Sequence, residues 1–223
     1  MNKNYNQDEI KRDYVKSRII LNDIKFYINA SHIEYPKEQE ETQLFICIKN
    51  NLIPLKNLFD LKPRLNRYSI DNKDLQELSK LLDKKLEVSN KLRNRIAGHL
   101  DDDVTNNAIL WEPYIFVKIQ NEEHKTFAQD YFIYKSLFES AINSCIEQDG
   151  VFTEEIDILI PDGRTKLLDF MDSTNNLAIN FLEKTLETID SLIVYWEQDD
   201  LKVFMSSIKK ASEVEFNIQK KRR

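Results

Sequence analysis

The fold is decided by the segment 71–100, which reads DNKDLQELSKLLDKKLEVSNKLRNRIAGHL. Its apolar residues recur mostly three or four positions apart, a spacing that aligns side chains along one face of an α-helix. The residues on this face are Leu75, Leu78, Leu82, Leu86, Leu92 and Ile96. Because Asp71 or Asn72 can cap the first turn, we predict a helix from this cap to about Leu100, with its apolar stripe buried against other helices.

The rest of the chain has a similar character. It is 223 residues long, 41% of its residues are hydrophobic, and it contains only 3 Gly and 5 Pro. The scarcity of these turn-forming residues favours helix. We therefore predict an all-α, up-and-down helical bundle. Apolar spacing predicts further helices over residues 7–33, 44–59, 127–147, 167–196 and 200–218. Pro36 can open the second of these, Pro54 predicts a kink within it, and Lys62–Ser69 is predicted to be a basic loop.

Two stretches fit the helical pattern less well. Residues 104–119 are aromatic and β-branched and are interrupted by Pro113, so both helix and strand remain open for them. Residues 150–163 carry isoleucines at alternate positions, followed by a Pro-Asp-Gly turn signal. We predict a short strand or an ordered loop there, inserted between helices.

Composition limits the organisation and location of the protein. No repeat or linker divides the chain, so we expect one domain over 1–223, with a core of about 7–148 and C-terminal helices of about 165–219. No signal peptide is visible and no stretch approaches the roughly 20 apolar residues that span a bilayer, which predicts a cytoplasmic protein without membrane contact. Cys47 and Cys145 lie within apolar patterns and are predicted to be buried, reduced thiols.

The chemistry of the chain is concentrated in the heptapeptide Arg93-Asn94-Arg95-Ile96-Ala97-Gly98-His99. An arginine can hold a phosphate anion, and a histidine can move a proton near neutral pH. On an ideal helical wheel, Arg93 and His99 flank the apolar stripe, each about 60° from its centre, while Asn94 points away. If this seam packs against a second copy of itself, a two-fold axis would pair Arg93 of one chain with His99 of the other. We therefore expect a homodimer with a composite phosphate site.

A local basic patch surrounds this motif in a chain whose net charge is −6. Between Lys84 and Arg95 there are five cations and one acid, a balance of +4. Lys91 and Arg95 are the candidate nucleic-acid contacts, and Arg95 could also replace Arg93 as the working arginine. The alternative is that these cations are solvated and are favoured only by the dipole at a helix C-terminus.

The spacing Arg93-Asn94, four further residues and then His99, near the end of a helix in an all-helical chain, resembles the HEPN superfamily. The following Asp101 resembles the Ala-His-x-Asp ending of abortive-infection-type members, with Gly98 where alanine is common. The match covers about ten residues, and the rest of the chain agrees only in helical architecture. The resemblance implies a HEPN-type bundle, with the HEPN-like core at about 7–148.

The resemblance also implies an activity. Many HEPN proteins are metal-independent endoribonucleases that act as dimers and leave a 2′,3′-cyclic phosphate. By position, His99 would transfer the proton, Arg93 would stabilise the charge that develops on phosphorus, and Asn94 would orient the pair. Such a protein would be the effector of a toxin or antiphage system, with RNA as substrate and an antitoxin or regulatory protein as partner. The acids Asp101–Asp103 would either repel phosphate or orient His99.

Two functions without catalysis are also compatible with this sequence. The chain could be a non-catalytic HEPN-like dimer that binds RNA, a nucleotide or a protein, or a helical interaction protein with no nucleic-acid role. A zinc site is not expected, because the three histidines are far apart in sequence and no Cys/His cluster exists. No cofactor is expected, since the chain has no Gly-rich phosphate loop. The aromatic residues Trp111, Tyr114 and Phe116 could stack on bases, although such a cluster is more typical of a core.

Overall fold

A computed structural model describes residues 6–31, 37–98, 101–116, 122–145 and 152–195. The chain divides into two compact units, Met1–Leu192 and Ile193–Arg223, and only residues 193–195 of the second unit are described. The described residues contain six α-helices and no strand, so the predicted all-α class is confirmed. The helix predicted over 200–218 lies outside the described residues.

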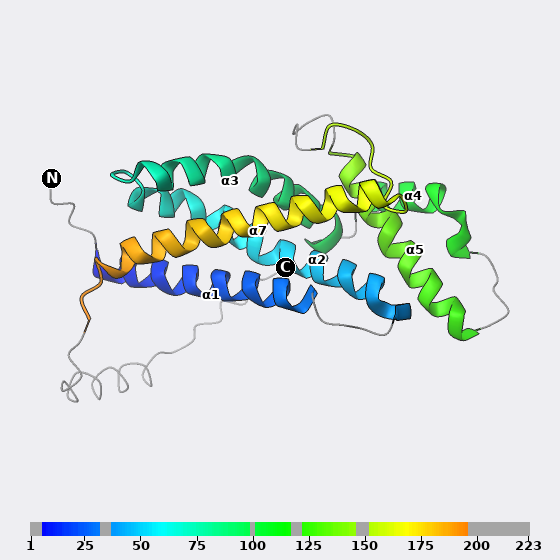
Figure 1. Cartoon of the computed structure of the whole chain (residues 1–223), viewed down its shortest axis with the longest axis horizontal. Helices are drawn as coiled ribbons and strands as arrows, with labels where there is room; N and C mark the ends of the chain where they lie inside the picture. Colours follow the sequence, from blue (N-terminus) through cyan, green and yellow to red (C-terminus); the bar gives the residue numbers. More distant parts are fainter. Residues whose placement is uncertain (1–5, 32–36, 99–100, 117–121, 146–151, 196–223) are drawn as a thin grey trace, which may run out of the picture. The chain divides into compact units, whose positions relative to one another are not determined.

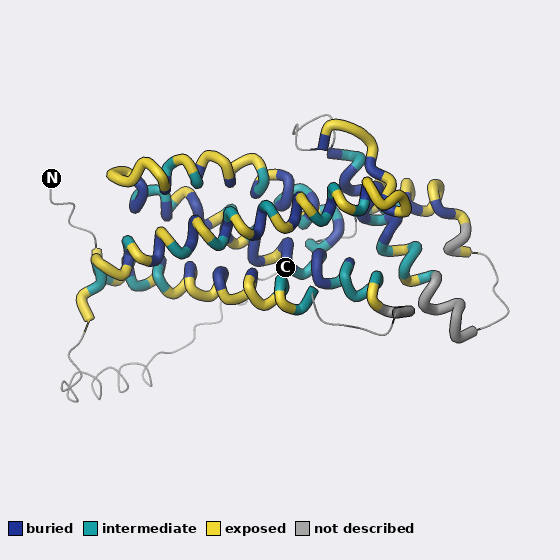
Figure 2. The backbone as a smooth tube through the Cα atoms, in the orientation of Figure 1, coloured by how far each residue is buried: buried dark blue, intermediate teal, exposed yellow. Residues whose placement is uncertain are grey.

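Four long helices of the first unit pack together (Figure 1). They are α1 (Gln7–Ser31), α2 (Lys37–Leu65), α3 (Lys73–Leu92) and α7 (Pro161–Asp190). Helices α1 and α3 each contact both α2 and α7, and helices that follow one another in this order run in opposite directions (Figure 1). Buried faces line the inside of this group, as the dark blue segments in Figure 2 show. Its fully buried side chains include Ile24, Leu52, Leu55, Leu82, Leu86 and Phe181.

The two remaining helices of the described residues form a second packing group. Helix α4 (Asp102–Trp111) packs against α5 (Glu122–Asn143), and α5 in turn packs against α2. A 3₁₀ turn over Pro113–Phe116 follows α4. The stretch whose type the sequence left open is therefore helical up to Phe116, and residues 117–119 lie outside the described part.

The decisive helix forms largely as predicted. The side chain of Asn72 caps α3 by accepting a hydrogen bond from the backbone N–H of Leu75, at 3.1 Å. The α-helical part ends at Leu92, however, and a π-helical turn over Arg93–Gly98 continues the chain. Residues 99 and 100, and with them the predicted end of the helix, lie outside the described residues.

The prediction of a basic loop over Lys62–Ser69 was wrong, and Pro54 does not interrupt the helix that contains it. Helix α2 runs without a break through Pro54 to Leu65, and a 3₁₀ turn over Asn66–Tyr68 follows it. A proline inside a helix costs about 3 kcal/mol, and complete burial of the neighbouring Leu52 and Leu55 offsets this cost. The cations are also not solvated loop residues: Lys62 is buried and its Nζ lies 2.5 Å from a carboxylate oxygen of Asp83 on α3.

The predicted strand near 150–163 does not form among the described residues, and the alternative of a loop is the one observed. Ile156 and Ile158 are buried, as their alternation suggested, but no neighbouring strand pairs with them. The side-chain amide of Asn143 forms hydrogen bonds with this backbone instead. It donates to the carbonyl of Ile156 at 3.0 Å and accepts from its N–H at 2.8 Å. Glu139 similarly accepts from the N–H of Ile158 at 2.6 Å. Helix α5 thus satisfies the backbone of this loop.

Several predicted boundaries shift by a few residues. Helix α1 ends at Ser31, α5 runs over Glu122–Asn143, and α7 begins six residues earlier than predicted, with Pro161 in its first turn. The early start requires Gly163, because a Cβ there would lie 2.1 Å from the backbone oxygen of Asp157. Among the described residues, every helix is too short or too polar to traverse a bilayer.

Candidate functional site

The motif arginine begins the π turn that ends the decisive helix. Leu92 and Ile96 are buried, as the helical wheel predicted, and this turn packs against α2 and α5. Arg93 and Arg95 are half-buried, whereas Asn94 is exposed. The structure therefore confirms the predicted burial of the seam and the edge position of Arg93.

His99, the residue predicted to transfer the proton, lies outside the described residues. Its position on the wheel assumed 3.6 residues per turn throughout. A π turn closes i→i+5 hydrogen bonds instead and is wider than an α-turn, so residues after Arg93 do not keep their predicted angles. The pairing of Arg93 with His99 across a two-fold axis therefore stays a prediction.

The guanidinium of Arg93 lies against Gly98. A Cβ at position 98 would be 2.5 Å from Nη1 of Arg93 and 3.0 Å from its Cζ, closer than side chains approach one another. The same Nη1 donates a hydrogen bond to the Oδ1 of Asn94 at 3.2 Å. Gly98 thus leaves the space in which the guanidinium lies, and Asn94 accepts a hydrogen bond from it.

Two buried polar atoms near this guanidinium have no hydrogen-bond partner among the described residues. They are Nε of Arg93 and Oδ1 of Asn90, three residues earlier on the same helix. A buried polar atom without a partner costs about 1–3 kcal/mol, and such atoms in native proteins are few. Sequence analysis did not single out Asn90, although its spacing of three from Arg93 places both on one face of a helix.

The acids that follow the motif have a structural role. Asp101 is the N-cap of α4, and its Oδ1 accepts from the N–H groups of Asp103 at 3.0 Å and Val104 at 3.3 Å. Its own N–H donates to the carbonyl of Arg95 at 3.1 Å, which joins the π turn to α4. Asp102 and Asp103 are exposed in the first turn of α4, where the helix dipole favours negative charge.

The two candidate nucleic-acid contacts differ in their surroundings. Nζ of Lys91 lies 3.8 Å from Oε1 of Glu87, one helical turn earlier. Arg95 forms no hydrogen bond or ion pair with its side chain among the described residues. A phosphate would therefore meet less competition from protein carboxylates at Arg95 than at Lys91.

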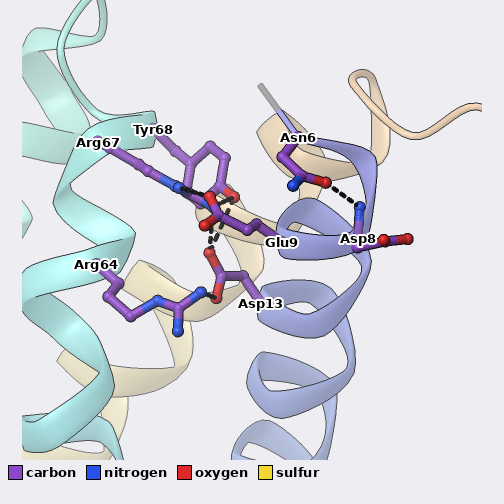
Figure 3. A network of polar contacts seen from close by, with 7 residues as sticks. All are labelled: Asn6, Asp8, Glu9, Asp13, Arg64, Arg67 and Tyr68. Carbon is purple, nitrogen blue, oxygen red and sulfur yellow. Dashed lines mark hydrogen bonds and ion pairs between the residues drawn. The ribbon is translucent and has the colours of Figure 1, made fainter. Parts of the chain in front are cut away.

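A larger charged cluster joins α1 to the end of α2 (Figure 3). Asp13 is fully buried, and its two carboxylate oxygens lie 2.8 Å from Arg64 and 2.7 Å from Arg67. The hydroxyl of Tyr68 donates to Asp13 at 3.0 Å, and Arg67 also pairs with Glu9 at 2.9 Å. Each charged group of this cluster has an oppositely charged neighbour, and the cluster lies far in sequence from the motif, so we interpret it as structural.

Burial shifts the pKa of Tyr68 in this cluster, and a hydrogen bond shifts that of Glu9. Loss of solvent raises the pKa of Tyr68 to about 12; the negative Asp13 contributes in the same direction, whereas Arg67 opposes the shift. The hydrogen bond from Arg67, with the charges of nearby arginines, holds the pKa of Glu9 below its usual value. Both shifts favour a protonated Tyr68 and an ionised Glu9 near neutral pH, and these are the states in which Tyr68 donates to Asp13 and Glu9 pairs with Arg67.

A second buried cluster lies between α4 and α5. Lys135 is buried and lies 3.3 Å from Glu112 and 3.1 Å from Glu139. Burial raises the pKa of Glu139, while the N–H of Ile158 and the charge of Lys135 act against that shift. Because Glu139 also binds the loop after α5, this cluster holds that loop in place.

The cysteines and aromatic residues that the sequence singled out lie in different surroundings. Cys47 and Cys145 are buried, as predicted, and burial raises the pKa of Cys47, which disfavours a nucleophilic thiolate. Trp111 and Phe116 are exposed, so the core interpretation was wrong for both, while the side chain of Tyr114 lies outside the described part. Within the described residues, no three His, Cys, Asp or Glu side chains are grouped as metal ligands.

Comparison with known proteins identified no matching protein family, no similar curated protein and no similar solved structure.

Proposed function

We propose that this protein is a metal-independent endoribonuclease of HEPN type, with Arg93, Asn94 and His99 as its catalytic residues. The observation that supports the proposal best is the environment of Arg93. Its guanidinium occupies the space left by Gly98, Asn94 orients it, and its Nε is buried without a partner among the described residues. A pre-oriented cation with unused donors is suited to an anion.

The chemistry requires only groups that the motif and RNA supply. His99 would remove the proton of the 2′-hydroxyl, and the 2′-oxygen would attack the adjacent phosphorus. The bond from phosphorus to the 5′-oxygen would then break, and the 5′-oxygen would take up a proton. The products are a 2′,3′-cyclic phosphate and a 5′-hydroxyl. Arg93 would offset the negative charge on the phosphorane, and Arg95 would hold a neighbouring phosphate.

The position of the acids is compatible with a bound anion. The carboxylate of Asp101 caps α4, and Asp102 and Asp103 are exposed in the first turn of that helix. In this arrangement the acids serve the start of α4, and Asp101 need not orient His99. The proposal includes RNA as substrate, a homodimer that brings two motifs together, and a role as toxin or antiphage effector with an antitoxin or regulatory partner.

One observation favours the second candidate, a HEPN-like dimeric binding or interaction protein without catalysis. Four large apolar side chains are exposed within a short stretch of sequence, on α4 and the turn after it. They are Ile109, Leu110, Trp111 and Phe116. An apolar surface of this kind is typical of contact with another protein, and it would serve a catalytic dimer and a non-catalytic one equally.

The test is cleavage of single-stranded RNA in EDTA by the purified protein. The wild type is compared with His99→Ala and, as a matched histidine control, His124→Ala. Loss of a positioned acid–base group lowers the rate by about 10²–10⁴, so His99→Ala should be nearly inactive and His124→Ala fully active. Thermal unfolding of each variant checks that the protein is folded.

Four results would count against the proposal. If no preparation cleaves RNA, the non-catalytic candidate takes its place. If all three proteins cleave equally, the activity comes from a contaminant or another site. If His99→Ala unfolds far below wild type, the histidine has a structural role. Wild-type products that end in a 3′-hydroxyl would exclude the proposed mechanism even with activity present.

A further inference from the structure

A cavity of about 320 Å³ lies between α3, the loop at 152–156 and α7. Lys85 contributes from α3, Phe152 and Ile156 from the loop, and Phe170 and Ser173 from α7. Its volume falls within the range of small-molecule sites, which are typically apolar with a few polar groups. None of these residues belongs to the Arg93 motif, so the cavity is independent of the proposed nuclease site.

Lys85 is one of two lysines that line this cavity. Its Nζ donates to the hydroxyl of Ser173 at 2.7 Å and lies 5.4 Å from the ring centre of Phe170. The Ser173 hydroxyl donates in turn to the carbonyl of Phe170 at 3.0 Å. No carboxylate among the described residues lies within ion-pair distance of Lys85. Two of its three N–H groups therefore have no partner there.

The second lysine of the cavity is in the opposite situation. Nζ of Lys166 lies 2.5 Å from Glu154 and 2.7 Å from Asp162, so its charge is already balanced. Burial lowers the pKa of Lys85, and no neighbouring acid acts against that effect. A half-buried ammonium without a counter-ion is unfavourable, and a bound anion would supply the missing charge.

We propose that this cavity binds a small organic monocarboxylate with an apolar body. The carboxylate would accept the two remaining N–H groups of Lys85. The apolar body would pack on Phe152 and Phe170, whose ring centres are 5.0 Å apart. The exposed Asp169 at the same cavity has no ion-pair partner among the described residues and would repel a doubly charged phosphate more strongly than a monoanion, so a monoanion is the ligand that fits the charges.

Isothermal titration of the full chain with three probes tests this proposal. Benzoate has the expected charge and shape, benzamide is its neutral counterpart, and phenyl phosphate is the doubly charged one. We expect benzoate to bind at least about tenfold more tightly than benzamide, which is the effect of a charged hydrogen bond. Phenyl phosphate should also bind more weakly than benzoate.

Variants locate the site. Lys85→Met keeps the length of the side chain and removes its charge, and Lys84→Met is the matched control on the exposed face of α3. Lys85→Met should lose the preference for benzoate, and Lys84→Met should keep it. The proposal is overturned if benzoate does not bind, if benzamide or phenyl phosphate binds as tightly, or if Lys85→Met still prefers benzoate. Should Lys85→Met fail to fold, Lys85→Gln replaces it, and the probe comparison on wild type decides the role of charge without any variant.

Discussion

At the scale of single residues, two glycines decide where neighbouring groups can lie. Gly98 leaves room for the guanidinium of Arg93, which is the end of a flexible side chain, whereas Gly163 leaves room for the backbone of Asp157. A flexible side chain can move away from a new methyl group at little cost, but a packed backbone cannot. The same substitution should therefore have opposite consequences at the two positions.

Gly98→Ala should leave stability nearly unchanged, whereas Gly163→Ala should be destabilised by about 1–3 kcal/mol. At position 98 the added Cβ would be 2.5 Å from Nη1 of Arg93, and this flexible side chain can move aside. At position 163 the added Cβ would be 2.1 Å from the backbone oxygen of Asp157, which is held in place by packing. Urea unfolding of both variants measures the difference, and equal losses would contradict it.

The surroundings of the two arginines predict which one works in catalysis. Arg93 lies against Gly98 and donates a hydrogen bond to Asn94, whereas the side chain of Arg95 forms no hydrogen bond or ion pair with a described residue. Arg93→Ala should reduce the cleavage rate by about 10²–10³. Arg95→Ala should mainly weaken RNA binding and lower its salt dependence. Rates at saturating RNA, with affinities at several salt concentrations, separate these effects, and the reverse pattern would make Arg95 the working arginine.

At the scale of secondary-structure elements, the junction between the π turn and α4 depends on Asp101. Its carboxylate caps α4 and its N–H contacts the π turn, so one residue joins both elements. Asp101→Ala should lower the free energy of unfolding by about 1 kcal/mol, the usual cost of losing an N-cap. Asp102→Ala, which removes only a charge near the helix dipole, should cost less than half as much. Equal losses in chemical unfolding would show that capping is not the reason.

At the scale of the whole molecule, the cluster around Asp13 ties α1 to the end of α2 and should govern stability in alkali. Tyr68 is buried, and its pKa of about 12 exceeds the usual value of 10. Between these two values the folded state holds a proton that the unfolded state has lost, so stability is complete below pH 10 and falls as pH rises towards 12.

Tyr68→Phe should make this alkaline loss smaller. One pKa unit corresponds to about 1.4 kcal/mol, so Tyr68 accounts for up to about 3 kcal/mol of the loss between pH 10 and 12. The variant has no phenol to titrate and should show a shallower decline over that range, whatever its stability at pH 7. Urea unfolding at pH 9, 10, 11 and 12 measures the slope. Parallel declines in wild type and variant would assign the loss to other groups.

Assembly is the other property of the whole molecule. We expect a homodimer whose two-fold axis lies near the motif, and the exposed apolar residues of α4, which directly follows it, should be covered in that dimer. Leu110→Glu should therefore yield monomers. Ile19→Glu, at another exposed apolar position on α1, should leave the dimer intact. Sedimentation at micromolar concentration distinguishes these outcomes, and a monomeric wild type would remove the basis for a composite site.

Local patterns in the sequence were enough to predict the helices α1, α2, α3, α5 and α7 and to single out the motif, but not the type of α4. Apolar spacing identified α3 and its buried leucines, because a side chain repeats on the same face every three or four residues whatever the helix packs against. Burial of Leu92 and Ile96 followed for the same reason, as did the half-buried position of Arg93 at the edge of the stripe.

Contacts between distant residues were decided only by the tertiary structure. The alternating isoleucines suggested a strand, but a strand needs a partner, and the side chains of Asn143 and Glu139 satisfied that backbone instead. Lys62 was predicted to lie in a loop, because the sequence around it does not show that Asp83, 21 residues later, lies beside it. The π turn that places Arg93 against Gly98 depends on packing against α2 and α5, which spacing along one helix does not encode. Sequence periodicity determined which faces are buried, and only the packed chain determined which groups meet there.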